Sequence, residues 1–253
     1  MPHIPHEDPD QTSDKDEAPD QPENGVPYQI PPEPSDNAVV IDGEWIAVDS
    51  ISRKDRASLP AYLRQDMIDN IFVKHDRYSD AYRAVESFHY PIRGGRPDKG
   101  KICILFGNTR AGKTHILKRY EKRYPPRLGE GAKLTPVVRS AMPDNGSVAG
   151  LLRSIMKGIG IQVSQQKNQD GLIRAVIDKL PEAGAELVFI DEYQRLRLNR
   201  RGISRDNVRE VVKTIADSCG VNVVIAGLPS TFGLLSADRQ IVGRGLLPYH
   251  RFD

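Results

Sequence analysis

The chain has 253 residues, of which 38% are hydrophobic and 28% charged, enough apolar material for one sizeable core with small additions. No apolar run reaches the roughly 18–20 residues of a membrane span, and the N-terminus lacks the regions of a secretory signal. We therefore expect a cytoplasmic protein without a membrane partner. Cys103 and Cys219 have no second Cys or His at ligand spacing, which argues against a disulfide or a zinc site.

Charge is distributed unevenly along the chain. Residues 1–37 hold ten acidic side chains and one lysine, whereas the remaining residues hold 35 basic and 24 acidic side chains, a net charge of +11. The first segment is rich in Pro, Gln and Asn and nearly free of large apolar groups, so we expect a disordered acidic tail. The basic remainder suits a polyanionic partner, although ordinary solubility charge explains it equally well.

Residues 38–96 are predicted to form an N-terminal extension with two helices. Residues 39–48 read as a short extended piece around Trp45. Apolar residues then recur at helical spacing over about 58–72 and 76–89, and the sequence Gly94-Gly95-Arg96-Pro97 breaks the pattern.

From residue 97 to residue 253, short apolar runs alternate with amphipathic helical patterns. Strands are predicted at 102–106, 134–139, 187–190 and 221–226. Helices are predicted from 113 to about 123, over 148–159, over 172–180, and over 208–216 with Ser204 or Asp206 as the N-cap. This alternation predicts an α/β core in which a parallel sheet is sandwiched by helices.

A glycine-rich motif joins the predicted strand at 102–106 to the helix that follows it. In Gly107-x-x-x-x-Gly112-Lys113-Thr114 the glycines let backbone N–H groups cradle phosphate oxygens at a helix N-terminus. Lys113 is expected to reach the β- and γ-phosphates of ATP, and the Thr114 hydroxyl to coordinate Mg²⁺. The residues expected to bind the nucleotide are Gly107, Asn108, Thr109, Arg110, Ala111, Gly112, Lys113, Thr114 and His115. The alternative is a chance octapeptide in a turn.

An acidic pair, Asp191 and Glu192, ends the apolar strand predicted at 187–190. Buried carboxylates are costly unless they meet a cation, so Asp191 is expected to hold the water shell of Mg²⁺. Glu192 is expected to polarise a water for in-line attack on the γ-phosphate, and with Lys113 it is a predicted catalytic residue. The alternative is an acidic pair that caps a helix.

Further polar residues follow the last of these strands. Ser230 and Thr231 are alternative candidates for a side chain that senses the γ-phosphate, or are turn residues after Pro229. Arg244, or alternatively Arg239, is a candidate arginine finger that would stabilise transition-state charge in the site of a neighbouring subunit. A solvated surface arginine is the alternative for each of them.

An arginine-rich segment comes directly after the acidic pair. Arginine side chains suit the phosphate backbone of nucleic acid, and such contacts carry no sequence information. A charged helix face with local ion pairs, for example to Asp206 and Glu210, is the alternative. The candidate DNA-binding residues are Arg195, Arg197, Arg200, Arg201 and Arg205.

With these motifs in place, the chain resembles an AAA+ ATPase and, more narrowly, the TniB/TnsC group of transposition regulators. The resemblance covers residues from about 49 to 244. Two of its motifs, the phosphate loop and Val188-Phe-Ile-Asp191-Glu192 with Gln194-Arg195-Leu196 behind it, are shared by many families. Those that point to TniB are Val223-Val-Ile-Ala-Gly227-Leu-Pro and Asp238-Arg-Gln-Ile-Val-Gly-Arg244.

The resemblance implies a P-loop ATPase that uses ATP and Mg²⁺ and assembles on double-stranded DNA as a ring or helical filament. It implies a DDE-type transposase and a TniQ-like targeting protein as partners. It also implies a helical lid with a second arginine sensor after the last strand of the sheet. This sequence ends at Asp253, roughly where that strand would lie, so we expect the lid to be absent from this chain.

Three functions fit these observations. The first is an ATPase that assembles on DNA and recruits a transposase. The second is a nucleotide-gated module that binds DNA or protein with little turnover, and the third is another AAA+ ATPase, such as a helicase-loader-like protein. A small-molecule kinase fits less well, because Glu192 favours water as the acceptor of the phosphoryl group.

Overall fold

A computed structural model defines the fold of most of the chain. It describes residues 38–41, 44–69, 74–89, 99–129, 131–164, 168–198, 203–236 and 250–252. The predicted disordered tail at residues 1–37 lies outside the described residues.

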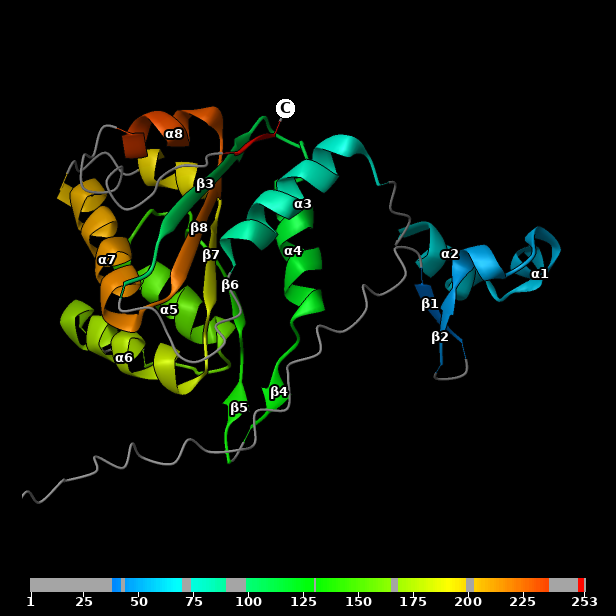
Figure 1. The fold of residues 1–253 in the computed structure, drawn as a ribbon, viewed down its shortest axis with the longest axis horizontal. Helices are drawn as coiled ribbons and strands as arrows, with labels where there is room; N and C mark the ends of the chain where they lie inside the picture. The colour runs from blue at the N-terminus through cyan, green and yellow to red at the C-terminus, as the bar shows by residue number, and fades with distance from the viewer. Residues whose placement is uncertain are drawn as a thin grey trace, which may run out of the picture. The chain divides into compact units, whose positions relative to one another are not determined.

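A five-stranded parallel sheet forms the centre of the fold (Figure 1). Its strands, in spatial order, are β6 (Val137–Ala141), β7 (Leu187–Asp191), β8 (Asn222–Gly227), β3 (Ile102–Gly107) and β9 (His250–Phe252). Strands β3, β7 and β8 are buried along their whole length, which explains their continuous apolar sequences. The predicted parallel sheet sandwiched by helices is confirmed.

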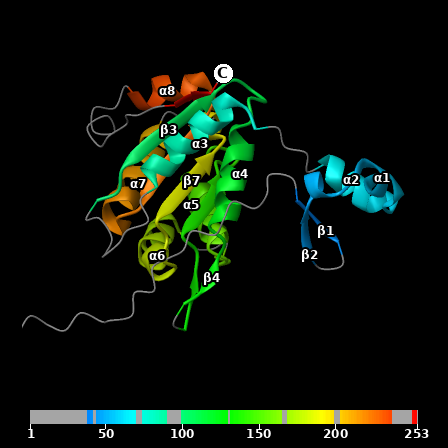
Figure 2. The ribbon, with the colours of Figure 1, turned by 45° about the vertical axis from the view of Figure 1, so that its right-hand side comes forward.

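Helices cover both faces of this sheet (Figures 1 and 2). One face carries α3 (Asp76–Phe88) and α4 (Lys113–Arg123). The other face carries α5 (Val148–Gly158), α6 (Gln169–Glu182) and α7 (Ile203–Cys219). A short helix, α8 (Pro229–Ser236), follows β8 and packs Leu235 against the cluster on this second face.

Alternate residues of β3, β7 and β8 enter two different apolar clusters. On β3, Ile102 and Ile104 pack into the cluster with α5, α6 and α7, whereas Cys103 and Leu105 pack into the cluster with α3 and α4. This is the two-residue period of a strand that is buried on both faces. Packing on both faces therefore holds the ends of these strands in place, and it also fixes where the loops after them begin.

The N-terminal extension contains more elements than the two predicted helices. β1 (Ala38–Ile41) and β2 (Glu44–Ala47) pair as an antiparallel hairpin, followed by the 3₁₀ turn η1 (Val48–Ser50). Helix α1 (Arg53–Ser58) was not predicted, and it is capped by the Ser52 hydroxyl, which accepts a hydrogen bond from the Asp55 N–H. The predicted helix at 58–72 corresponds to α2 (Ala61–Asp69), and the one at 76–89 to α3.

Several predicted boundaries in the core were wrong, and two of them concern β6 and α7. The second strand was predicted from residue 134, but a small hairpin of β4 (Arg127–Leu128) and β5 (Lys133–Leu134) precedes it, and β6 begins after Pro136, which has no N–H to donate to a ladder. Helix α7 begins at Ile203, so Ser204 and Asp206 lie inside it and neither caps it. Among the described residues, no helix has both the length and the apolar character required to cross a membrane.

Candidate active site

The loop between β3 and α4 folds around the ammonium group of Lys113. Lys113 Nζ donates hydrogen bonds to the carbonyl oxygens of Gly107, at 2.9 Å, and Asn108, at 2.7 Å. Gly112, at the N-cap of α4, has a φ of 101° that favours glycine. Arg110 has a φ of 62°, which is rare for a non-glycine residue, and its side chain is exposed. The loop therefore has left-handed residues at positions 110 and 112, as a tight turn before a helix N-terminus requires.

The acidic end of β7 also affects the pKa of Lys113. Partial burial lowers the pKa of Lys113 below its ordinary value, and the charges of Asp191 and Glu192 oppose part of that lowering. The ammonium group and the two carboxylates thus share one site, although they come from segments far apart in the sequence.

Asp191 lies at the end of β7 with 4% of its surface exposed. Its Oδ2 accepts a hydrogen bond of 2.6 Å from the Thr114 hydroxyl, and its Oδ1 accepts one of 2.8 Å from the N–H of Glu192. The predicted metal ligands Thr114 and Asp191 are therefore in direct contact. Hydroxyl and carboxylate oxygens are the kind of ligand that Mg²⁺ takes.

The protein contribution to a metal site here is small. Groups of three or more His, Cys, Asp or Glu side chains that could hold a metal ion do not occur in the part of the chain that the structure describes. A site with one hydroxyl and one carboxylate fits Mg²⁺, which usually keeps several waters and completes its shell with phosphate oxygens.

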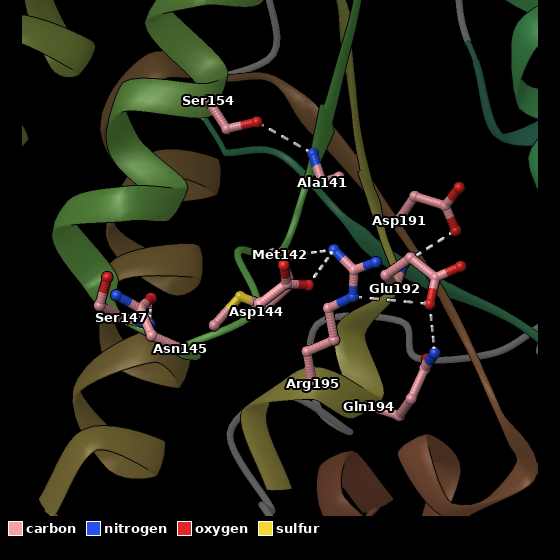
Figure 3. A network of polar contacts seen from close by, with 10 residues as sticks. All are labelled: Ala141, Met142, Asp144, Asn145, Ser147, Ser154, Asp191, Glu192, Gln194 and Arg195. Carbon is pink, nitrogen blue, oxygen red and sulfur yellow. Dashed lines mark hydrogen bonds and ion pairs between the residues drawn. The ribbon is translucent and has the colours of Figure 1, made fainter. Parts of the chain in front are cut away.

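Glu192 adopts a left-handed backbone conformation, with a φ of 57°. Its Oε2 accepts a hydrogen bond of 2.5 Å from Gln194 Nε2 and lies 3.8 Å from Nε of Arg195 (Figure 3). Within the described residues, its other oxygen, Oε1, has no hydrogen-bond partner. One oxygen of this carboxylate is thus held by the protein, and the other is available to a ligand or water.

Arg195 connects the acidic pair to the loop that follows β6. Its Nη1 donates to the carbonyl oxygen of Met142 at 3.0 Å and lies 3.1 Å from Oδ1 of Asp144 (Figure 3). With Glu192 as a second acidic neighbour, its guanidinium group already has several protein partners. The structure thus gives Arg195 an internal role besides the DNA contact predicted for it.

The other candidate DNA-binding residues are only partly described. The backbone of Arg197 lies in the 3₁₀ segment η2 (Tyr193–Leu198), and that of Arg205 lies in α7. Arg200 and Arg201 lie outside the described residues. The DNA contact of this segment stays a prediction.

The remaining candidates follow β8 or the phosphate loop. Ser230 and Thr231 lie in the first turn of α8; Ser230 is half-buried and Thr231 is fully buried. His115 lies in the first turn of α4 with its side chain exposed, and its pKa is lowered by partial burial and by the charges of three basic neighbours on that helix. Arg239 and Arg244 lie outside the described residues.

Sequence reasoning gave Gln194 no role in the site. Its side chain contacts Glu192 and also accepts a hydrogen bond of 3.2 Å from the N–H of Leu228, directly after β8. Leu228 is 34 residues away in the sequence, so no local spacing could have signalled the contact.

The strand order, the phosphate loop after β3 and the acidic pair at the end of β7 define the class of this protein by its fold, which is the P-loop nucleotide-binding fold of the AAA+ type. A family model described as "Bacterial TniB protein" matches residues 71–246. The chain therefore belongs to the TniB family. A search of curated proteins finds no match.

Several solved structures are similar to this chain. The ORC1 protein of Aeropyrum pernix in complex with DNA is 17% identical, with a TM-score of 0.50, over 72% of this chain and 46% of that one. The ORC2 protein of the same organism is 17% identical, with a TM-score of 0.48, over 70% and 47%. DnaA from Aquifex aeolicus bound to AMPPCP is 15% identical, with a TM-score of 0.42, over 74% and 49%. The chain spans less than half the length of each, and the ORC1 likeness supports the fold alone.

Proposed function

We propose that this protein binds ATP with Mg²⁺ at residues 107–115, hydrolyses it, and uses it to assemble on double-stranded DNA and recruit a transposase. The observation that carries the ATPase part is the direct contact between the Thr114 hydroxyl and Asp191, which joins the phosphate loop to the acidic end of β7. A hydroxyl and a carboxylate placed together in this way suit a metal-bound triphosphate.

The loop binds the phosphates through its own charges and dipoles. The N–H groups at the start of α4 and the partial positive charge of the helix attract phosphate oxygens. Lys113 exchanges its hydrogen bonds to the Gly107 and Asn108 carbonyls for bonds to the β- and γ-phosphates.

The two carboxylates at the end of β7, those of Asp191 and Glu192, have different roles. Mg²⁺, when bound, neutralises phosphate charge; Thr114 would be its direct protein ligand, and Asp191 would hold its water shell. Glu192 orients a water and accepts its proton, and this role is supported by its Oε1, which makes no hydrogen bond to any described residue.

The ATPase proposal is tested by Glu192→Gln. The variant keeps the shape of the side chain and loses its basicity, so ATP should bind normally and turn over at least ~10²-fold more slowly. Steady-state phosphate release and binding of a fluorescent ATP analogue measure the two effects separately.

Glu182→Gln is the matched control. Glu182 is an exposed residue at the end of α6 whose ion pair is with Lys179, so turnover should stay unchanged. If Glu192→Gln turned over ATP as fast as the unmodified protein, the nucleotide-gated module with little or incidental turnover would replace the ATPase.

The proposed assembly on DNA is supported by membership of the TniB family and by the net charge of +11 on residues 38–253. We infer a DDE-type transposase and a TniQ-like targeting protein as its protein partners, and a ring or helical filament of this chain as the assembly.

Electron microscopy tests the assembly directly. The full chain is imaged with double-stranded DNA, with and without a non-hydrolysable ATP analogue. We expect rings or filaments on DNA only when the nucleotide is present. Particles that remain single in both conditions would reject the assembly but leave the ATPase proposal standing.

A further inference from the structure

The side chain of Gln194 joins the ends of two neighbouring strands. Its Nε2 donates to Oε2 of Glu192 at 2.5 Å, directly after β7 (Figure 3). Its Oε1 accepts from the N–H of Leu228 at 3.2 Å, directly after β8. A single half-buried amide thus ties the carboxylate of Glu192 to the backbone of the next strand.

The orientation of this amide is determined by its partners. A backbone N–H can only donate, so the Gln194 oxygen must face Leu228, and the NH₂ group must then face Glu192. An ionised carboxylate can only accept, so both contacts are satisfied in this orientation and neither would be satisfied in the flipped one.

Gly227, the last residue of β8, leaves room for this arrangement. A Cβ atom at Gly227 would lie 2.4 Å from Oγ1 of Thr231 and 3.0 Å from Oε1 of Gln194. Thr231 is fully buried, so its hydroxyl cannot move aside into solvent. A side chain at position 227 would therefore collide with Thr231 and also press on the amide that holds Glu192.

The carboxylate that Gln194 holds belongs to a residue with an unusual backbone. Glu192 has a φ of 57°, and such conformations persist only where the surrounding structure specifies them. Gln194 takes one oxygen, Oε2, and leaves Oε1 free of protein hydrogen bonds within the described residues. That division suits a base that must present one oxygen to a water.

We propose that Gln194 is a positioning residue for Glu192, with Gly227 as the residue whose missing side chain makes the contact possible. The inference rests on the proposed ATPase function. It assigns Gln194 to the orientation of the base and not to nucleotide binding, because its two partners, Glu192 and Leu228, are not residues of the phosphate loop.

The first test is Gln194→Ala, with Gln169→Ala on the exposed start of α6 as control. We expect the turnover rate of Gln194→Ala to fall at least about tenfold, as misplacement of a reacting group by a fraction of an ångström would produce. Binding of the fluorescent ATP analogue should stay unchanged. The unfolding midpoint should fall slightly, because the Leu228 N–H loses its partner, but the protein should remain folded under the assay conditions. Gln169→Ala should match the unmodified protein in all three measurements.

A double-mutant cycle separates positioning from a general structural role. If Gln194 acts through Glu192, then Gln194→Ala should cause no further loss of turnover in a Glu192→Gln background. A further loss of tenfold there would overturn the proposal. So would unchanged or faster turnover in Gln194→Ala alone.

The second variant is Gly227→Ala, with Gly233→Ala in α8 as its control, because a Cβ at Gly233 meets no atom within 4 Å. Gly227→Ala should lower turnover and keep nucleotide binding, whereas Gly233→Ala should change neither. Normal turnover in a folded Gly227→Ala protein would count against the proposal. If Glu192→Gln itself left turnover unchanged, the proposed ATPase function would fail first, and the inference with it.

Discussion

Lys113 is the residue on which nucleotide affinity should depend most. Its ammonium group is held by two backbone carbonyls and faces the acidic end of β7, so it is placed before any ligand arrives. A group that is positioned in advance loses little freedom on binding. Because Lys113 exchanges its two carbonyl hydrogen bonds for bonds to phosphate, its contribution to affinity should be the amount by which charge-assisted bonds to an anion exceed bonds to neutral carbonyls.

Replacing Lys113 by Ala should weaken ATP binding at least about 100-fold, the loss expected when roughly 3 kcal/mol of charge-assisted hydrogen bonding is removed. ATP-dependent DNA association should disappear with it. Titration of a fluorescent ATP analogue measures the affinity, and Lys122→Ala, exposed on the same helix, serves as the control. Normal affinity in Lys113→Ala would contradict the assignment of the site.

The thiol of Cys103 should be inert in the folded protein. Burial raises its pKa from 9.0 to about 12, so at pH 8 almost none of it is the reactive thiolate, and its reactivity should rise with pH as the thiolate fraction grows. Cys219 is also buried. A thiol reagent at pH 8 should label the native protein slowly and label both cysteines quickly in guanidinium chloride. Fast labelling of the native chain would show that one of these sites opens.

At the scale of elements, α3 is joined to the core by the side chain of Asn222 at the start of β8. Asn222 Nδ2 donates to the Phe88 carbonyl oxygen at 2.9 Å, and its Oδ1 accepts from the Lys101 N–H at 2.9 Å. The side chain of this first residue of β8 thus connects the end of α3 to the residue before β3. The apolar face of α3 packs on the same side of the sheet as α4.

Asn222→Ala should lower the free energy of unfolding by about 2–4 kcal/mol, because it leaves a donor and an acceptor without partners at a largely buried position. Chemical denaturation measures the change. Asn207→Ala, at an exposed position on α7, should change stability by less than about 0.5 kcal/mol. Equal stability of the two variants would mean that α3 is not held through Asn222.

At the scale of the whole molecule, charge is divided between two segments of opposite sign. The acidic segment 1–37 and the basic remainder have opposite signs, and a long polyanion such as DNA would be attracted to the remainder alone. Contacts to a phosphate backbone release counterions, so the strength of binding should fall steeply with salt.

Replacing Arg200 and Arg201 together by Ala should weaken DNA binding for all sequences alike and reduce the slope of log affinity against log salt by about two. Fluorescence anisotropy at several salt concentrations measures the slope. Arg77→Ala with Arg83→Ala, two exposed arginines of α3, removes the same charge elsewhere. An unchanged slope in the Arg200 and Arg201 variant would remove these residues from the interface.

Most of the core could be predicted from the sequence. The helix at 113–123 matches α4, and the strands at 102–106, 187–190 and 221–226 match β3, β7 and β8 within one residue. The small β4–β5 hairpin was not predicted, because its two-residue strands are too short to carry a periodic pattern.

The sequence by itself determined the order of the elements, because the period at which apolar residues recur is a local property of the chain. It determined the phosphate loop for the same reason, because the spacing from Gly107 to Thr114 is also local. Only the tertiary structure decided that β7 lies between β6 and β8, and that Gln194 reaches Leu228. The partners in such contacts are 34 residues apart here and 134 apart for Asn222 and Phe88. These partners are brought together by packing between elements, and that packing cannot be predicted from the local spacing of residues in the sequence.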